Sequence, residues 1–116
     1  MDRPAGDSVV VIPALNEERA IHAVVQDALS HCKHVIVVDD GSSDGTLAAI
    51  ADLSVVCIRH DAPLGKARAL LDGFRRALEL GATGVLTMDG DGQHAAADLP
   101  RLMAAAARYP NRGRAP

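Results

Sequence analysis

The run Val35-Ile36-Val37-Val38 decides the predicted fold, because it is β-branched throughout and offers no polar side to water. Three similar apolar runs are spaced along the chain: Val9-Val10-Val11-Ile12, Val55-Val56-Cys57-Ile58 and Val85-Leu86-Thr87-Met88. Such uniformly apolar runs are typical of strands in a parallel sheet that is covered on both faces. The sequence therefore predicts a mainly parallel sheet of four strands.

Helical periodicity separates these runs. The predicted apolar stripes comprise Ile21, Val24, Val25, Ala28 and Leu29; then Ala67, Leu70, Leu71, Phe74 and Leu78; then Leu99, Leu102, Met103 and Ala106. Asp98 is the predicted N-cap of the third helix, with Pro100 in its first turn. A short helix is expected from Thr46 to Asp52. Alternating strands and helices form right-handed βαβ units, so we predict a doubly wound α/β fold with helices on both faces.

Length and composition limit the classes of protein. The 116 residues suit one domain, which we place at residues 8–109, after a disordered segment (1–7) and before a polar tail (110–116). A net charge of −3 and only one Phe, one Tyr and no Trp argue against a nucleic-acid partner. The polar start and short apolar runs predict neither a signal peptide nor a transmembrane segment, and hence a cytoplasmic protein.

The cysteines and most histidines offer no chemical pattern. Cys32 and Cys57 are far apart, and we expect reduced, structural thiols. Four histidines lack partners at metal-ligand spacing and are interpreted as structural or solvated: His22, His31, His34 and His60.

Polar loops follow three of the predicted strands. In a doubly wound sheet, ligands bind beyond the carboxyl ends of the strands, near the point where strand order reverses. We therefore expect four segments to meet at one edge: Pro13-Ala14-Leu15-Asn16-Glu17-Glu18, Asp39-Asp40-Gly41-Ser42-Ser43-Asp44-Gly45-Thr46, Asp89-Gly90-Asp91 and Gly65-Lys66-Ala67-Arg68 at a helix start.

Asp89 and Asp91 form an Asp-x-Asp pair directly after a buried strand. Mg²⁺ and Mn²⁺ prefer oxygen ligands and are commonly held by one or two carboxylates, with water and substrate phosphates completing the shell. Gly90 and Gly92 permit a sharp turn and close approach of a phosphate. The alternative is a solvated turn, in which Asp and Gly are ordinary residues.

Asp39 and Asp40 are adjacent carboxylates at a strand end, an arrangement that repulsion disfavours unless something uses it. We favour contact with a nucleoside base or ribose over a role in the turn. For Gly41 to Thr46 we favour turn chemistry and a helix start.

Two helix starts carry the other candidate residues. Asn16 and Glu17 suit the opening of the first helix as cap and first-turn acid, which is compatible with a ligand role. Lys66 and Arg68 are cations at a helix start, where the dipole welcomes an anion. Contact with a phosphate and extension into solvent remain equal alternatives for these two side chains.

Taken together, the segments quoted above, with Met88-Asp89-Gly90-Asp91-Gly92-Gln93-His94 in full, resemble the family 2 glycosyltransferases of GT-A fold. The form Asp-Gly-Asp-Gly-Gln-His is most similar to the branch of dolichol-phosphate mannosyltransferases and polyprenyl-phosphate glycosyltransferases. The resemblance covers residues 8 to about 109 in order and spacing.

This resemblance implies metal-dependent transfer of a sugar from a UDP- or GDP-linked donor to an acceptor such as a polyprenyl phosphate at the inner face of a membrane. It places Pro13, Asn16, Glu17 and Asp39 or Asp40 at the nucleoside and Lys66 and Arg68 near the diphosphate. Asp89, Asp91 and Gln93 would face Mg²⁺ or Mn²⁺.

The chain also departs from the family. Pro63 and Ala67 stand where many members have Asn and a second Gly. Members extend further, into an acceptor region with a carboxylate base, so we expect a donor-binding half truncated after the fourth strand and the following helix. Its catalytic base is unassigned, and a homodimer or partner chain would supply the missing strands. The alternative is a non-catalytic nucleotide-binding or structural remnant; a nucleotidyltransferase is disfavoured because the first loop lacks glycine.

Overall fold

The computed structural model describes residues 8–91, and the structural statements below concern this range. Several predictions fall outside it: the third helical stripe at 99–106 with Asp98 and Pro100, the metal contact of Gln93, and the two terminal segments.

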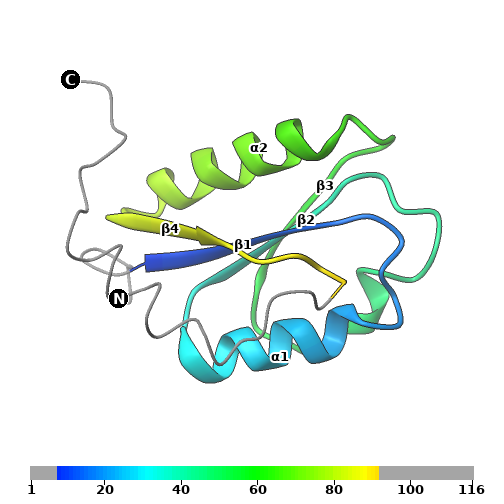
Figure 1. The fold of residues 1–116 in the computed structure, drawn as a ribbon, viewed down its shortest axis with the longest axis horizontal. Helices are drawn as coiled ribbons and strands as arrows, with labels where there is room; N and C mark the ends of the chain where they lie inside the picture. Colours follow the sequence, from blue (N-terminus) through cyan, green and yellow to red (C-terminus); the bar gives the residue numbers. More distant parts are fainter. Residues whose placement is uncertain (1–7, 92–116) are drawn as a thin grey trace.

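The described chain forms a four-stranded parallel sheet with α-helices between the strands (Figure 1). In chain order, the elements are β1 (Ser8–Ala14), α1 (Ile21–His31), β2 (Val35–Asp39), the 3-10 helix η1 (Ala48–Ile50), β3 (Val56–Arg59), α2 (Lys66–Glu79) and β4 (Gly84–Thr87). The strand order is β3-β2-β1-β4. This confirms the predicted doubly wound parallel sheet.

The two central strands are buried on both faces because α1 and α2 cover opposite sides of the sheet (Figure 1). Alternate residues of β1 therefore enter different cores. Val10 and Ile12 pack with α1, whereas Val9 and Val11 pack on the side of α2, and all four are fully buried. The all-apolar runs thus have the physical origin that the sequence indicates.

The stripe predicted for α2 is right for Leu70 and Phe74, which pack against the core, and wrong for its other residues. The buried residues are Ala69, Gly73 and Ala77, whereas Leu71 and Leu78 are exposed. A Cβ added at Gly73 would lie 2.4 Å from Cγ1 of Val11. The helix backbone therefore lies so close to the sheet that only small side chains fit between them, and size rather than hydrophobicity decides which side faces inward.

Three other local predictions need correction. The helix expected over 46–52 is only the 3-10 turn Ala48–Ile50. The strand expected to be covered on both faces at 55–58 is the edge strand Val56–Arg59, which alternates between half-buried and exposed residues. Cys32 is buried, but Cys57 is exposed on that edge. β3 pairs only with β2, while α2 packs mainly over β1 and β2, so one side of β3 faces solvent.

Candidate functional site

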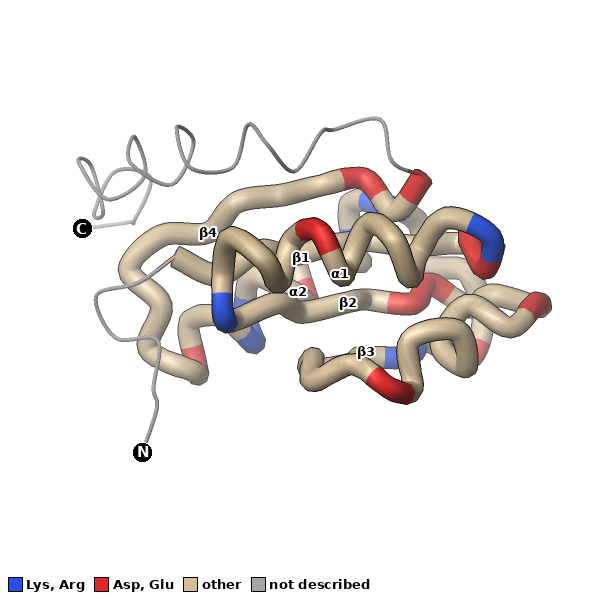
Figure 2. Tube along the Cα trace, turned by 90° about the horizontal axis from the view of Figure 1, so that it is seen from below, with Lys and Arg blue, Asp and Glu red and all other residues tan. Residues whose placement is uncertain are grey.

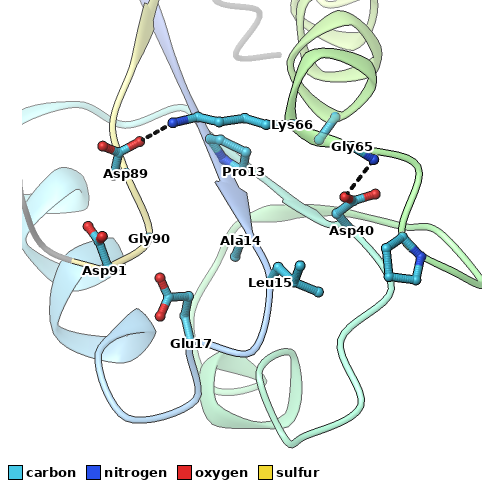
Figure 3. A pocket seen from close by; sticks show the side chains of 12 residues that line it. Pro13, Ala14, Leu15, Glu17, Asp40, Gly65, Lys66, Asp89, Gly90 and Asp91 are labelled. Atoms are coloured by element: carbon cyan, nitrogen blue, oxygen red, sulfur yellow. Dashed lines mark hydrogen bonds and ion pairs between the residues drawn. The ribbon is translucent and has the colours of Figure 1, made fainter.

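The strand order reverses between β1 and β4, because the chain builds β2 and β3 on one side of β1 and then crosses to the other. A crevice beyond the carboxyl ends of these two strands is the expected ligand site of such a sheet. A pocket of about 350 Å³ lies there. Its lining comprises Pro13, Ala14, Leu15, Glu17, Asp40, Pro63, Gly65, Lys66, Ala69, Asp89, Gly90 and Asp91 (Figure 3).

The pocket confirms that the four predicted segments meet at one edge. Acidic positions also gather at the end of the molecule to which β2 and β4 lead (Figure 2). Six predicted site residues within 8–91 line the pocket, and three do not. The lining residues are Pro13, Glu17, Asp40, Lys66, Asp89 and Asp91; the others are Asn16, Asp39 and Arg68.

The acidic wall of the pocket comes from two loops. Asp89 and Asp91 follow β4, and the Glu17 carboxylate approaches from the loop after β1 (Figure 3). Burial raises the pKa of Glu17, and the negative charges of Asp91, Asp44 and Asp89 raise it further. This part of the pocket is therefore an environment of negative potential that favours a cation.

Gly90 allows the loop after β4 to lie against the end of β1. A Cβ at this position would lie 3.2 Å from both the Cβ of Ala14 and the carbonyl oxygen of Pro13. The glycine thus allows the Asp-x-Asp backbone to pack directly against the end of β1, as its place in the motif suggests.

The oxygen chemistry of Asp89 and Asp91 fits Mg²⁺ or Mn²⁺, which need only one or two carboxylates when water and phosphate supply the other ligands. Among residues 8–91, no set of three or more His, Cys, Asp or Glu side chains is arranged to hold a metal ion.

Lys66 forms the basic side of the pocket. It is the first residue of α2, and its Nζ lies 3.0 Å from Oδ1 of Asp89 (Figure 3). Gly65 precedes it with a φ of 105°, and no side chain caps the helix. An uncapped helix start beside a flexible ammonium is an environment that suits a phosphate.

Arg68 lies outside the pocket lining. Its Nε donates to both carboxylate oxygens of Asp72, at 3.1 and 3.2 Å, one helical turn away. The contact with a diphosphate that the sequence suggests for Arg68 therefore stays a prediction.

The two adjacent aspartates have protein partners. Oδ1 of Asp39 accepts from the Ser42 backbone at 3.0 Å, which is turn chemistry. Asp40 accepts from the backbone N–H groups of Leu64 and Gly65, at 2.8 and 3.0 Å. The chain itself thus uses this carboxylate pair, and their contact with a nucleoside stays a prediction.

Asn16 does not cap the first helix as expected, because α1 begins only at Ile21. It adopts a left-handed φ of 55°, donates from its backbone to Oγ of Ser42 at 2.8 Å, and accepts from the Ser43 backbone at 2.9 Å. The Glu17 backbone likewise donates to Oγ1 of Thr46. The loop after β2 therefore joins the loop after β1 as well as forming its own turn, a function that the sequence pattern did not reveal.

His60 is connected to the pocket through Asp40, a contact that the sequence did not reveal. It is 8% exposed, with Nδ1 2.8 Å from Oδ1 of Asp40 and Nε2 2.7 Å from Oδ2 of Asp72. It is structural, as one of the two interpretations had it, but no spacing rule joins residues 40, 60 and 72. Its position directly after β3, level with the other loops, was the available signal.

The cluster of Asp40, His60 and Asp72 consists of groups that shift one another's pKa. The hydrogen bond to Asp40 raises the pKa of His60, burial opposes this, and Asp72 raises it again. Burial by itself raises the pKa of Asp40, but hydrogen bonds from His60, Leu64 and Gly65 outweigh it, so this pKa is lowered. These contacts therefore favour the protonated imidazole and the ionised carboxylates.

An acidic pair opposite a lysine thus lies at the reversal point of a doubly wound sheet, where such sheets bind their ligands. Comparison with known proteins identifies the class. The profile of Glycosyl transferase family 2 matches residues 9–113, and the chain belongs to this family. The fold is that of the GT-A glycosyltransferases.

Curated relatives support the predicted branch. The chain is 34% identical over 112 residues to UDP-N-acetylglucosamine--dolichyl-phosphate N-acetylglucosaminyltransferase of Methanococcus voltae, covering 81% of this chain and 45% of the relative. It is 38% identical over 109 residues to polyprenol monophosphomannose synthase of Mycolicibacterium smegmatis, covering 87% and 41%. The chain thus spans less than half the length of these relatives.

A solved structure of similar fold is glucosyl-3-phosphoglycerate synthase from Mycobacterium tuberculosis in complex with Mn²⁺ and UDP-glucose. The TM-score is 0.60 at 27% identity, covering 73% of this chain and 33% of the other. A second structure, described as a mycobacterial protein, aligns with a TM-score of 0.67 at 24% identity and covers 88% and 37%. Separately, no helix within residues 8–91 has the length and apolar character needed to cross a membrane.

Proposed function

We propose that this chain is the donor-binding part of a glycosyltransferase that moves a sugar from a nucleotide diphosphate sugar to a polyprenyl phosphate or similar acceptor. The observation that carries the proposal is the pocket between β1 and β4. It sets the carboxylates of Asp89 and Asp91 opposite Lys66 and the uncapped start of α2.

The two walls of the pocket suit different parts of such a donor. Pro13, Leu15 and Pro63 offer apolar surface for a base or ribose, with Glu17 nearby as an acceptor for hydroxyl groups. Lys66 suits the diphosphate as a compact positive charge. Asn16 and Asp39 would contribute to the nucleoside side by holding the loops from which these groups project.

Asp89 and Asp91 would hold Mg²⁺ or Mn²⁺, with Gln93 as a further ligand by resemblance. The metal would supply Lewis-acid stabilisation of the charge that develops on the departing diphosphate. The Lys66 ammonium adds positive charge at the same place, and its pairing with Asp89 keeps it there before the donor binds.

The names of the relatives support the substrate class. One curated relative is named for UDP-N-acetylglucosamine and dolichyl phosphate, and a neighbour in the solved structures holds Mn²⁺ and UDP-glucose. A UDP-linked donor and a lipid phosphate acceptor at a membrane surface are therefore the substrates we propose. No base is assigned on the acceptor side, since a carboxylate neutralised by a metal is a poor proton acceptor.

Calorimetric titration of the chain with UDP and with GDP, each with and without Mn²⁺, tests the proposal. We expect binding that requires Mn²⁺ and that is lost in Asp91→Asn. Asp52→Asn is the matched control, because Asp52 is an exposed carboxylate outside the pocket. A folded chain that binds neither nucleotide would contradict the proposal and favour the remnant alternative.

A further inference from the structure

A buried chain of hydrogen bonds leads from the pocket into the interior behind it. Asp40, at the end of β2, joins the backbone of Leu64 and Gly65 on one side and the His60 imidazole on the other. The imidazole continues to Asp72 in the second turn of α2. The Asp40 carboxylate thus links the end of β2 directly to the loop after β3, and it is linked to α2 through His60.

The bonds of Asp40 hold the backbone that directly precedes Lys66. Leu64 and Gly65 are the last two residues before α2, and their N–H groups point at Asp40. Lys66 follows at once and reaches across to Asp89. A rotation of the Asp40 carboxylate would release both N–H groups and so move the start of the helix that borders the pocket.

A second contact holds the same loop against β2. Gly41 has a φ of 80°, and a Cβ there would lie 2.4 Å from the carbonyl carbon of Ala62 and 2.5 Å from the nitrogen of Pro63. The loop before α2 therefore packs backbone to backbone against the loop after β2. Its remaining freedom lies at Leu64 and Gly65, where Asp40 provides the hydrogen bonds.

The side chain of His60 holds the Asp40 carboxylate from one side, opposite the two backbone N–H groups. It is buried, donates toward Asp40 through Nδ1, and is held from its other nitrogen by Asp72 at 2.7 Å. An imidazole that is hydrogen-bonded at both ring nitrogens has one preferred orientation. It therefore restricts the orientation of the Asp40 carboxylate that it contacts. Arg68, on the outer side of Asp72, completes the chain to the helix surface.

We propose that His60 is a positioning residue for the donor site: together with Asp72 it holds Asp40 so that the Leu64–Gly65 backbone presents Lys66 to the pocket. This inference rests on the proposed function, which supplies the ligand, a nucleotide diphosphate. The geometry of the loop before α2 does not depend on that function. His60 touches no substrate and acts through Asp40.

Three substitutions separate positioning from a general contribution to stability. His60→Ala removes both hydrogen bonds. His60→Asn keeps an N–H near the place of Nδ1, and so keeps the bond to Asp40, but loses Asp72. His22→Ala is the matched control, because His22 pairs with Asp52 at 3.2 Å on an exposed surface away from the pocket.

The experiment measures UDP affinity with Mn²⁺ and the hydrogen exchange of the Leu64 and Gly65 amides. We expect His60→Ala to weaken UDP binding by about 10-fold or more, as loss of an outer hydrogen-bonding partner does elsewhere, and to speed exchange at both amides. His60→Asn should restore most of the affinity and protection although it remains less stable than the parent. His22→Ala should change neither quantity.

Wild-type affinity and amide protection in His60→Ala would overturn the proposal, as would equal losses in His60→Ala and His60→Asn, which a purely structural role predicts. If the parent chain binds no UDP, the proposed function fails, and amide exchange alone decides the positioning. If His60→Ala does not fold, His60→Leu replaces it: leucine fills the buried site but makes neither hydrogen bond, so the expected result is faster exchange at the same two amides, and unchanged exchange overturns the proposal.

Discussion

Lys66 Nζ lies 3.0 Å from Oδ1 of Asp89, so the start of α2 and the end of β4 are bridged across the mouth of the pocket (Figure 3). The lysine side chain is 65% exposed, whereas that of Asp89 is 26% exposed. An ion pair so open to solvent contributes little to folding. Its position instead suits a role in attracting and holding a diphosphate.

Lys66→Ala is therefore expected to weaken UDP binding by about tenfold, equivalent to roughly 1.4 kcal/mol, while uridine, which lacks the diphosphate, binds unchanged. The free energy of unfolding should change by no more than about 1 kcal/mol. Calorimetry with both ligands measures the first effect and urea unfolding the second. Arg76→Ala, which breaks the exposed pair with Glu79, is the control; equal losses for UDP and uridine would refute the diphosphate role.

Gly73→Ala is expected to destabilise the fold although alanine favours helix. The new methyl group would meet Cγ1 of the fully buried Val11, whose β-branched side chain has little rotamer freedom. Overpacking of this kind costs about 1–3 kcal/mol, which urea unfolding would detect. Ala23→Gly on the exposed face of α1 measures helix propensity alone. A more stable Gly73→Ala protein would show that α2 does not pack as closely as described.

Substitutions at Asn16 should distinguish backbone conformation from hydrogen bonding. Asn16→Ala keeps a β-carbon at a left-handed φ but loses the side-chain hydrogen bonds with Ser43 that help asparagine to adopt it, so a loss of about 1–3 kcal/mol is expected. Asn16→Gly loses only these bonds and should be less destabilising. Urea unfolding of both variants makes the comparison, and equal losses would mean that the left-handed conformation carries no cost here.

The cluster around His60 makes stability depend on pH in a defined direction. The pKa of His60 is raised from 6.5, chiefly by Asp40, so its stabilising effect is complete below 6.5 and is lost as pH rises through the raised pKa. Asp40 and Asp72 have lowered pKa values, and their contribution is lost as pH falls through those values. After His60, Arg68 also lowers the pKa of Asp72, and Arg75 lies 3.9 Å from the same carboxylate.

Urea unfolding across this range should therefore show the free energy of unfolding falling above pH 6.5 in the parent chain. His60→Asn has no imidazole at this position. Its free energy of unfolding should therefore lack the part of the fall above pH 6.5 that His60 causes. Parallel pH profiles for the two proteins would mean that His60 is not held as an imidazolium.

Much of the fold follows from local pattern. The all-apolar runs predict four parallel strands, of which β1 and β2 are buried as expected while β3 and β4 are only partly buried. The stripe from Ile21 to Leu29 matches the buried side of α1. The orientation of α2 could not be predicted from hydrophobicity, because a glycine between Ala69 and Ala77 marks the contact side only once the distance to β1 is known.

The candidate site, like the fold, could be predicted only in part from the sequence. Parallel strands bring their carboxyl ends to one edge, so the meeting of Glu17, Lys66, Asp89 and Asp91 could be inferred from order along the chain. The cluster around His60 could not, since its bonds depend on side-chain directions across three elements. Repulsion between adjacent carboxylates led us to favour a ligand for Asp39 and Asp40. Their partners in the structure are groups of the chain itself, and their contact with a nucleoside stays a prediction.

The most direct test of the central claim is paramagnetic broadening of the amide NMR signals by Mn²⁺ in the presence of UDP. The account predicts that the amides of Gly90, Asp91 and Glu17 broaden first, with Gly65 and Lys66 next. Lys33, His34 and Val56, at the opposite ends of the strands, should stay sharp. Broadening centred away from the β1–β4 pocket, or unaltered by Asp91→Asn, would contradict a metal-dependent nucleotide site at this position.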